Sequence, residues 1–404
     1  MAVIVQKYGG TSVGTLERIE AVADNIVETR RKGHQVIVVL SAMAGETNRL
    51  LALAHAIDHQ PATRELDMLL SSAEQVSISL LAISLIKRGF SAISLLAHQI
   101  GIYTDNSFGS ARIKSVSGNR LLQALEQEQV AVVAGFQGQD NEHNVTTLGR
   151  GGSDTSAIAV AVALKAAECQ IFTDVDGIYT ADPRIEPLAQ KISFISFEEM
   201  LVMANLGAKV LQNRAVEYAM RYNMPIRVLS SFTSGQGTKV MNEKALVSES
   251  IAIKAVSNIA HQASQLLVSL EELIDHKSIA KVLTILGDAG IEIDMISYSK
   301  NNKCKYNVKF SASREYFCQI DDVLQKMTQK TSIRAIKYND KVVKLSAVGI
   351  GMKSHSGIAG RFFSALDEKG IEPLLISTSE INISVIIDES ALIKGVRCLH
   401  RTFM

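Results

Sequence analysis

The chain has 404 residues, of which 47% are apolar and 21% are charged, and its formal net charge is +1. This composition is typical of a globular protein, and the length predicts two or three domains. The near-neutral charge argues against a nucleic-acid-binding surface. The four cysteines form no Cys-x-x-Cys pair, which argues against a zinc site or disulfide framework and for a reducing compartment. The longest apolar run, residues 157–164, is too short to span a membrane, and the first residues lack a signal-peptide layout. We therefore expect a cytoplasmic protein with no membrane segment.

Residues 1–229 are predicted to alternate between strands and helices. Helices are expected over 15–33, 63–88 and 155–167, where apolar residues recur at helical spacing. Strands are expected over 2–8, 35–42, 131–136 and 169–175. Because these strands are continuous runs of β-branched and other apolar residues between helices, they predict a parallel sheet covered on both faces, and the fold class is α/β.

The second half of the chain contains an internal repeat. Residues 283–297 and 363–377 align without a gap at an offset of 80, and each predicts a helix, a glycine stop and a strand. Flanking strands and helices complete two α+β modules of the form βαββαβ, which typically bind ligands or partners. We predict a catalytic domain over 1–229, a connector over 230–263, and modules over 264–340 and 341–404.

The stretch TTLGRGGSDTSA, residues 146–157, lies where a strand is predicted to give way to a helix. Its polar and flexible residues are Gly149, Arg150, Gly151, Gly152, Ser153 and Asp154. The glycines allow backbone N–H groups to approach a ligand, the helix N-terminus favours an anion, and Arg150 can hold a carboxylate or phosphate with two hydrogen bonds. Ser153 and Asp154 are expected at the helix cap. The same residues also fit a glycine-rich turn capped by serine and aspartate.

Two further stretches suggest phosphate chemistry. KYGGTSVG, residues 7–14, follows the first strand at the end where open α/β sheets bind ligands, and Lys7 can neutralise a phosphate there. It lacks the Gly-Lys-Ser/Thr of a P-loop, and the Rossmann fingerprint also fails. TDVDGIYTADPR, residues 173–184, offers one carboxylate for Mg²⁺ and Arg184 for a phosphate, or it is simply an aspartate-rich turn. Glu74 and Lys209 each interrupt an apolar helical stretch, and an exposed helix face is the alternative for both.

Taken together, these stretches closely resemble the aspartate kinases of the amino-acid-kinase fold. The resemblance covers nearly the whole chain and includes SAMAGETN, FQG, SFEEM, GAKVL, GMKSH and STSEI. It implies a parallel-rich, amino-acid-kinase-like sheet covered by helices, followed by two ACT modules that join a homodimer. It also implies transfer of the ATP γ-phosphoryl group to the β-carboxylate of L-aspartate, which gives 4-phospho-L-aspartate for lysine, threonine and methionine synthesis. The cofactors implied are ATP and Mg²⁺, with no metal site made of protein ligands alone.

The resemblance also implies a role for each matching residue. The catalytic residues would be Lys7, Asp154 and Lys209. Glu74 would bind the aspartate ammonium and Arg150 its α-carboxylate, and the other substrate contacts would be Thr47, Gly151, Gly152 and Ser153. The ATP contacts would be Lys7, Tyr8, Gly9, Gly10, Ser41, Thr173, Asp174, Tyr179, Arg184 and Lys209.

The expected chemistry agrees with this set of residues. The β-carboxylate of aspartate has a pKa near ~4 and is ionised at neutral pH, so no general base is needed. None of the matched catalytic stretches contains a histidine. The reaction needs positioning and charge neutralisation, which lysine, arginine, Mg²⁺ and backbone amides supply.

Departures from the family pattern fall in the two modules. Regulated relatives carry a Pro-Gly type of turn where this chain has LIDHKSIAK, residues 273–281. Ile274 replaces an acidic residue, although Asp275 is close enough to stand in, and Tyr298 replaces an amide. Ser356 and Pro373 also depart, whereas Ala73 in place of a glycine before Glu74 matters little. We expect weakened inhibition by lysine and threonine. The alternatives are a kinase for another small acid such as glutamate and a non-catalytic amino-acid sensor.

Overall fold

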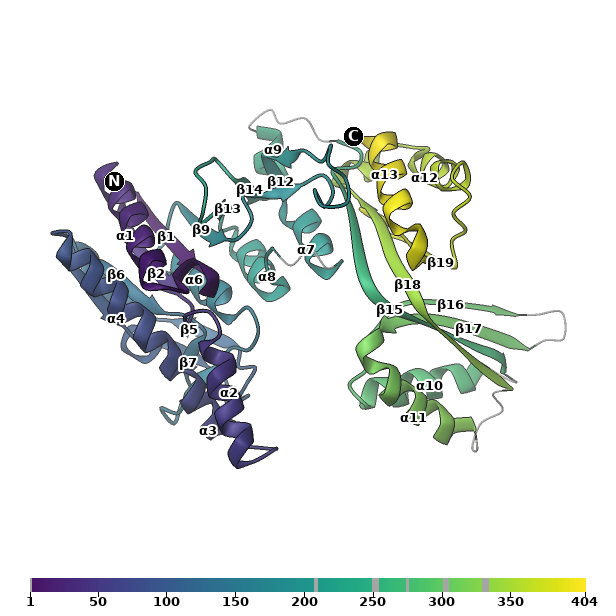
Figure 1. The fold of residues 1–404 in the computed structure, drawn as a ribbon, viewed down its shortest axis with the longest axis horizontal. Coiled ribbons are helices and arrows are strands. Elements are labelled where there is room, and N and C mark those ends of the chain that lie inside the picture. Colours follow the sequence, from purple (N-terminus) through teal and green to yellow (C-terminus); the bar gives the residue numbers. More distant parts are fainter. Residues whose placement is uncertain (1, 207–209, 249–253, 274–275, 301–304, 329–333) are drawn as a thin grey trace. The chain divides into compact units, whose positions relative to one another are not determined.

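The computed structural model describes residues 2–206, 210–248, 254–273, 276–300, 305–328 and 334–404. These residues form two compact units. Figure 1 shows the ribbon coloured along the sequence, from purple at the N-terminus to yellow at the C-terminus. The first unit holds the residues up to Ile178, then Lys191–Ala204 and the described residues from 210 to 248. The second unit holds the described residues from 254 onward together with an excursion of the chain, Tyr179–Gln190.

In the described part of the first unit, eight strands form the main sheet in the order β12-β14-β13-β9-β1-β2-β6-β3. Their bounds are β1 Val3–Tyr8, β2 Gln35–Leu40, β3 Ala92–Leu95, β6 Val130–Ala134, β9 Glu168–Thr173, β12 Phe194–Ser196, β13 Ile226–Ser230 and β14 Thr238–Met241. Only β14 runs antiparallel to a neighbour, β13, and β1 pairs in parallel with both β2 and β9. The predicted parallel-rich α/β sheet is therefore confirmed.

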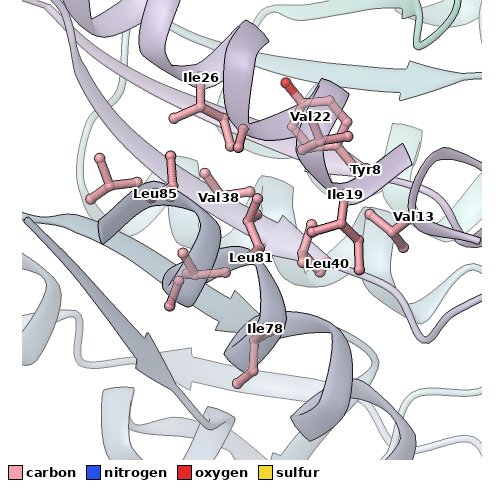
Figure 2. Close-up of a cluster of buried hydrophobic side chains, with 14 of the residues drawn as sticks. Tyr8, Val13, Ile19, Val22, Ile26, Val38, Leu40, Ile78, Leu81 and Leu85 are labelled. Carbon is pink, nitrogen blue, oxygen red and sulfur yellow. The ribbon is translucent and has the colours of Figure 1, made fainter. Parts of the chain in front are cut away.

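The first unit also holds nine α-helices among its described residues, and several of them pack against this sheet through buried apolar side chains. Their bounds are α1 Leu16–Arg31, α2 Glu46–Ile57, α3 Thr63–Leu70, α4 Ser72–Lys87, α5 Asn119–Glu126, α6 Gly152–Ala163, α7 Phe197–Asn205, α8 Asn213–Tyr222 and α9 Glu243–Ser248. Figure 2 shows α1, α4 and β2 contributing to one buried cluster, with Ile26, Leu81 and Leu40 among the fully buried side chains. Each such side chain stabilises the fold by about 1.5–3 kcal/mol relative to exposure.

The predicted helix over 63–88 is two helices, α3 and α4, which meet at Ser71. The backbone of Ser71 stays in the right-handed helical region, and its hydroxyl donates to the carbonyl of Met68 at 2.8 Å. By length and composition alone, the combined stretch Thr63–Lys87 is apolar enough to cross a membrane. Ile78, Leu81 and Leu85 of this stretch lie in the core of the first unit, which accounts for its apolar character.

A smaller sheet combines two strands that precede β6 in the chain with two strands that lie between β6 and α6, and none of the four was predicted. It has the order β5-β4-β7-β8, with bounds β4 Ile102–Thr104, β5 Ile113–Val116, β7 Gln137–Gln139 and β8 Val145–Thr147. The hairpin of β7 and β8 delivers the chain to the stretch 146–157. The chain then leaves the first unit at β10 (Ile178–Tyr179) and returns to it at β11 (Lys191–Ile192).

The second unit is built on one antiparallel sheet of six strands among its described residues, in the order β16-β17-β15-β18-β20-β19. Its strands are β15 Asn258–Leu273, β16 Ile293–Lys300, β17 Tyr306–Ser313, β18 Ala335–Val348, β19 Leu375–Thr378 and β20 Asn382–Asp388. Its helices are α10 His276–Asp288, α11 Phe317–Thr328, α12 Ile358–Asp367 and α13 Leu392–Phe403. Figure 1 shows the long strands β15 and β18 running through both modules.

The first module has the predicted order of strands and helices, but the second obtains one strand from an unexpected place. Among the described residues, α13 is the last element, and the predicted final strand of this module does not come after it. Residues 258–262, which we assigned to the connector, pair antiparallel with residues 344–348 of β18 and take that place. This pairing satisfies backbone groups along β18 that would otherwise form an open sheet edge.

Candidate active site

Three of the predicted stretches meet at one edge of the main sheet. Because β2, β1 and β9 are adjacent and parallel, their carboxyl ends place Ser41, Gly9 and Asp174 at the same edge. The Gly9 N–H donates to the carbonyl of Phe172 at 3.3 Å, and the Ser41 N–H donates to the carbonyl of Tyr8 at 3.1 Å. Ligands in open α/β sheets bind at such an edge.

The turn after β1 brings the backbone close to the turn after β2. A Cβ atom on Gly10 would lie 3.0 Å from the carbonyl oxygen of Ala42, which is closer than side chains normally come. Gly10 begins a short 3₁₀ helix, Gly10–Val13, and the hydroxyls of Ser12 and Ser231 lie 2.5 Å apart. The glycines therefore serve close backbone approach, which agrees with a phosphate cradle.

The N-terminus of α6 faces the same edge through its first turn. Gly151 is the N-cap, with φ of +75°, and the helix begins at Gly152. The prediction that Ser153 and Asp154 cap the helix is wrong, since both lie in its first turn. The Asp154 carboxylate instead lies 2.6 Å from the Nζ of Lys7, so this ion pair joins the helix to β1. Both side chains are largely buried, which strengthens their attraction.

Glu74, in the first turn of α4, is a buried carboxylate with an unused oxygen. Its side chain is 3% exposed, so the alternative of an exposed helix face is wrong. Its Oε1 accepts the N–H of Ala42 at 3.1 Å, and its Oε2 has no hydrogen-bonding partner among the described residues. Burial raises the pKa of this carboxyl to about 8. A buried, half-satisfied carboxylate is suited to binding a cationic ligand group.

The remaining predicted contacts of the first unit differ in their exposure. Arg150 is exposed, and its guanidinium makes no hydrogen bond or ion pair within the described chain. Thr47, in α2, and Thr173, at the end of β9, are half-buried. Asp174 is exposed and accepts the hydroxyl of Thr173 at 3.0 Å.

The other predicted ATP contacts are Tyr8, Tyr179, Arg184 and Lys209. The side chain of Tyr8 is fully buried, stacks on the ring of Phe172 at 4.5 Å and has its pKa raised by burial, so only its backbone is available for the predicted contact with ATP. Tyr179 and Arg184 belong to the second unit, where the Arg184 guanidinium bonds Asp182 at 2.7 Å. Lys209 lies outside the described residues.

The excursion Tyr179–Gln190 is held by the second unit through backbone and side-chain hydrogen bonds. The Ile259 N–H donates to the carbonyl of Thr180 at 2.8 Å, and the Asn258 amide donates to that of Tyr179 at 2.5 Å. The Thr180 hydroxyl lies 2.9 Å from Nε2 of His400. Burial lowers the pKa of His400, which favours the neutral ring that can accept this hydrogen bond.

Asp67, in α3 of the first unit, is a buried carboxylate that was not predicted as a candidate from the sequence. Asp67 is fully buried and accepts hydrogen bonds from Gly109 and Thr147. A signal for it was present, because Asp67, Leu70 and Glu74 recur at helical spacing and so place two carboxylates on an apolar face.

Comparison with known proteins agrees with this architecture. The model of the amino acid kinase family matches residues 2–230, which is more than half of the chain. A model of the ACT domain matches residues 345–403. An aspartate kinase from Pseudomonas fluorescens is 47% identical over 406 residues, covering 100% of this chain and 98% of the relative. The chain belongs to the aspartate kinase family. An aspartokinase from Geobacillus stearothermophilus is 42% identical and covers 100% of this chain and 97% of its own.

Solved structures of family members share the fold over the full length. The structure of E. coli aspartokinase III in complex with aspartate and ADP matches with a TM-score of 0.79 at 25% identity, covering 99% of both chains. The same enzyme in complex with lysine and aspartate matches with a TM-score of 0.82, also at 25% identity, covering 100% of this chain and 99% of its own. The first of these complexes is the R-state of that enzyme and the second is its T-state.

Proposed function

We propose that this aspartate kinase family member transfers the γ-phosphoryl group of ATP to the β-carboxylate of L-aspartate. The products are ADP and 4-phospho-L-aspartate, and the reaction is the first step towards lysine, threonine and methionine in the cytoplasm. The observation that carries the proposal is the buried carboxylate of Glu74, whose free Oε2 matches the ammonium of an amino-acid substrate. Full-length relatives that bear the name aspartate kinase support the choice of aspartate over glutamate.

The proposed mechanism uses charge and position. An oxygen of the substrate β-carboxylate forms the new bond to the γ-phosphorus, the bond to the bridging oxygen of ADP breaks, and the electron pair leaves with ADP. Lys7 stabilises negative charge on the phosphoryl group as it transfers, and the N-terminus of α6 adds its partial positive charge. Asp154 orients Lys7, whereas Arg150 and Glu74 hold the α-carboxylate and the ammonium. Lys209 is proposed as a second cation beside the phosphates.

Mg²⁺ is proposed to arrive with the nucleotide, held mostly by phosphate oxygens. The described residues contain no cluster of three or more His, Cys, Asp or Glu side chains that could hold a metal ion by themselves. Kinase sites need only one or two carboxylates beside the phosphates. Asp176 and Asp182 are engaged with Lys191 and Arg184, which leaves Asp174 at the end of β9 as the best-placed carboxylate. When bound, the ion neutralises phosphate charge.

The test of this activity is an ATP-dependent hydroxamate assay. Purified protein with MgATP and L-aspartate should form an acyl phosphate that hydroxylamine traps, and EDTA should stop the reaction. L-glutamate and a sample without ATP are the controls. Trapping with glutamate but not with aspartate would show that the substrate assignment is wrong, and no trapping with any acid would favour a non-catalytic sensor.

The functional division along the chain is proposed to follow the boundaries given by the sequence. These are a catalytic domain over 1–229, a connector over 230–263, and ACT modules over 264–340 and 341–404. Strand β15 begins at Asn258 and runs through the boundary at 264, so the connector contributes to the second module's sheet.

Inhibition by lysine and threonine is proposed to be weak. Ile274 and Asp275, which bear on this prediction, lie outside the described residues. A hollow of about 390 Å³ in the second unit is lined by β15, β16, β17 and the region of β19. Its acidic side chain, Glu271, is already paired with Lys337 at 2.6 Å. An effector whose ammonium lacks a partner loses about 1–3 kcal/mol of binding free energy.

We expect activity to persist with lysine, threonine or an equimolar mixture at millimolar concentration. The measurement is a titration of hydroxamate formation at aspartate concentrations near its KM. Strong inhibition at sub-millimolar concentration would contradict the prediction.

The second unit is proposed to join two copies of the chain into a homodimer. The edge strand β16 exposes Ile296 and Tyr298, and the opposite edge strand β19 exposes Ile376, each with roughly half or more of its surface accessible. Exposed apolar side chains on sheet edges favour pairing with another chain. A variant that ends near Asn242 should be a monomer by light scattering, and a dimer of that variant would place the interface in the catalytic domain.

A further inference from the structure

Asp67 is a buried carboxylate to which the proposed mechanism assigns no role. It lies in α3 with an exposed fraction of 0%. Its Oδ2 accepts the N–H of Thr147 at 2.7 Å and that of Gly109 at 2.9 Å, and its Oδ1 accepts the Thr147 hydroxyl at 2.7 Å. Hydrogen bonds to an ionised acceptor are about twice as strong as neutral ones, so Asp67 holds its donors firmly.

The donors belong to the base of the loop that carries Arg150. Thr147 is the last residue of β8, three residues before Arg150. The carbonyl of Thr147 accepts the N–H of Ala111 at 2.9 Å, and a Cβ on Gly149 would lie 2.9 Å from the carbonyl oxygen of Gly109. The segment around Gly109 and the end of β8 therefore form one block, which Asp67 fixes to α3.

The same helical stretch carries Glu74. Asp67 and Glu74 are seven residues apart, about 10 Å along a helix axis. The backbone between them stays helical at Ser71, and the Ser71 carbonyl accepts the amide of Gln137 at 2.9 Å, which ties the junction to β7. One stretch of backbone therefore fixes the position of Glu74 directly, and it fixes the base of the loop that carries Arg150 through the hydrogen bonds of Asp67.

We propose that Asp67 is a positioning residue that fixes Arg150 relative to Glu74. The two charged groups can then hold the α-carboxylate and the ammonium of one amino-acid substrate at the same time. This inference rests on the proposed function, because it assumes that Arg150 and Glu74 bind an amino acid. Loss of a substrate contact that is equally strong in the ground state and the transition state raises KM and leaves kcat nearly unchanged.

The first test compares two buried aspartates in the same unit. Asp67→Asn places an NH₂ group against N–H or O–H donors and releases at least one of them. We expect the KM for aspartate to rise about 10–100-fold, the scale for a misplaced or lost charge-assisted contact, with kcat changed less than about threefold and the KM for ATP unchanged. Asp140→Asn is the matched control.

Asp140 is also buried and also accepts three donors, which are the Glu142 N–H at 2.9 Å, the Asn144 N–H at 2.8 Å and the Asn144 amide at 3.0 Å. These bonds close the turn between β7 and β8, at the opposite end of β8 from Arg150. Asp140→Asn should lose a similar amount of thermal stability but keep the wild-type KM. Equal KM changes in the two variants, or a loss of kcat at constant KM in Asp67→Asn, would overturn the proposal.

A second test keeps the carboxylate and changes its donor. Thr147→Ser retains the hydroxyl and should keep the KM for aspartate, whereas Thr147→Val has nearly the same shape, loses the hydroxyl and should raise KM several-fold. Equal KM values for Thr147→Val and wild type would count against the proposal. This pair remains informative if Asp67→Asn does not fold.

The decisive measurement is a double-mutant cycle with Arg150→Ala. If Asp67 acts through Arg150, then Asp67→Asn should raise the KM of the Arg150→Ala variant by less than about twofold, although it raises that of the wild type at least tenfold. If the effects of Asp67→Asn and Arg150→Ala on KM are additive, the inference about Asp67 is wrong, but the proposed function still stands. Calorimetric titration of the wild type with aspartate distinguishes failure of this inference from failure of the proposed function. If the wild type does not bind aspartate, the proposed function itself is wrong.

Discussion

Replacement of Lys7 by alanine is expected to lower kcat by roughly 10²–10³-fold, the scale for one lost electrostatic stabiliser of a transition state. Lys7 is the penultimate residue of β1, close in sequence to the glycines of the phosphate cradle, and its Nζ lies 2.6 Å from Asp154 at the N-terminus of α6. Its charge is therefore held in place before the nucleotide binds. The measurement is kcat in the hydroxamate assay at saturating MgATP and aspartate, with circular dichroism to confirm the fold.

The matched control is an ion pair at the other edge of the same sheet. Arg227→Ala removes the partner of Glu168, which lies 3.1 Å away near the amino ends of β13 and β9, and it should leave kcat within about twofold. Lys7→Ala also leaves Asp154 buried without its cation, which destabilises the fold. Lys7→Met/Asp154→Asn removes both charges. If that variant melts like the wild type and is still inactive, instability is not the cause of the loss. An unchanged kcat in Lys7→Ala would show that Lys7 has no catalytic role.

The second large effect concerns Glu74 and its dependence on pH. Because burial raises the pKa of Glu74 to about 8, most molecules of the free enzyme hold a proton on this carboxyl at neutral pH. Binding of the substrate ammonium requires the ionised form. We therefore expect kcat/KM for aspartate to fall about tenfold per unit as pH decreases below about 8, since this quantity reports the free enzyme. Glu74→Gln should remove that slope and lower kcat/KM at pH 8 by about 10–100-fold.

The same shift makes a prediction about stability that does not depend on activity. Between pH 4.5 and about 8, the folded chain keeps a proton on Glu74 that the unfolded chain releases, so raising the pH across this interval destabilises the fold. Glu74→Gln should therefore melt higher than the wild type at pH 8 and show little gain near pH 4.5.

Glu199→Gln is the matched control for both measurements. Glu199 is a buried carboxylate of the first unit that accepts the N–H and hydroxyl of Ser196, and it should retain the wild-type slope of kcat/KM. A Glu74→Gln variant that also keeps this slope would show that another group titrates.

The sequence predicted four adjacent strands of the main sheet, β9, β1, β2 and β6, because apolar, β-branched runs such as those of β2 and β6 are typical of buried parallel strands. The other four strands of this sheet were not predicted. The predicted stretches then had to meet, since parallel strands end at the same edge. The hairpin of β7 and β8 was missed because its three-residue strands, such as Gln137–Gln139, have buried polar side chains and no apolar alternation. Local patterns do not reveal polar groups whose partners lie far along the chain.

Two other features depended on partners that are distant in sequence. Asp154 has the residue type of a helix cap, but the cation of Lys7 draws its carboxylate into an ion pair. The strand that completes the second module, residues 258–262, precedes the first module in the chain, so a repeat with a constant offset does not reveal it. In both cases the local preference is real and a long-range interaction determines the outcome.

The excursion Tyr179–Gln190 limits how this protein can be dissected. It follows β9 and the proposed nucleotide contacts Thr173 and Asp174, yet its hydrogen-bonding partners Asn258, Ile259 and His400 come much later in the chain. A variant that ends near Asn242 lacks all of these partners and leaves the excursion without support. Inactivity of such a fragment would not show that catalysis requires a dimer. Assembly and turnover are better separated by point substitutions on the sheet edges than by any single cut in the chain.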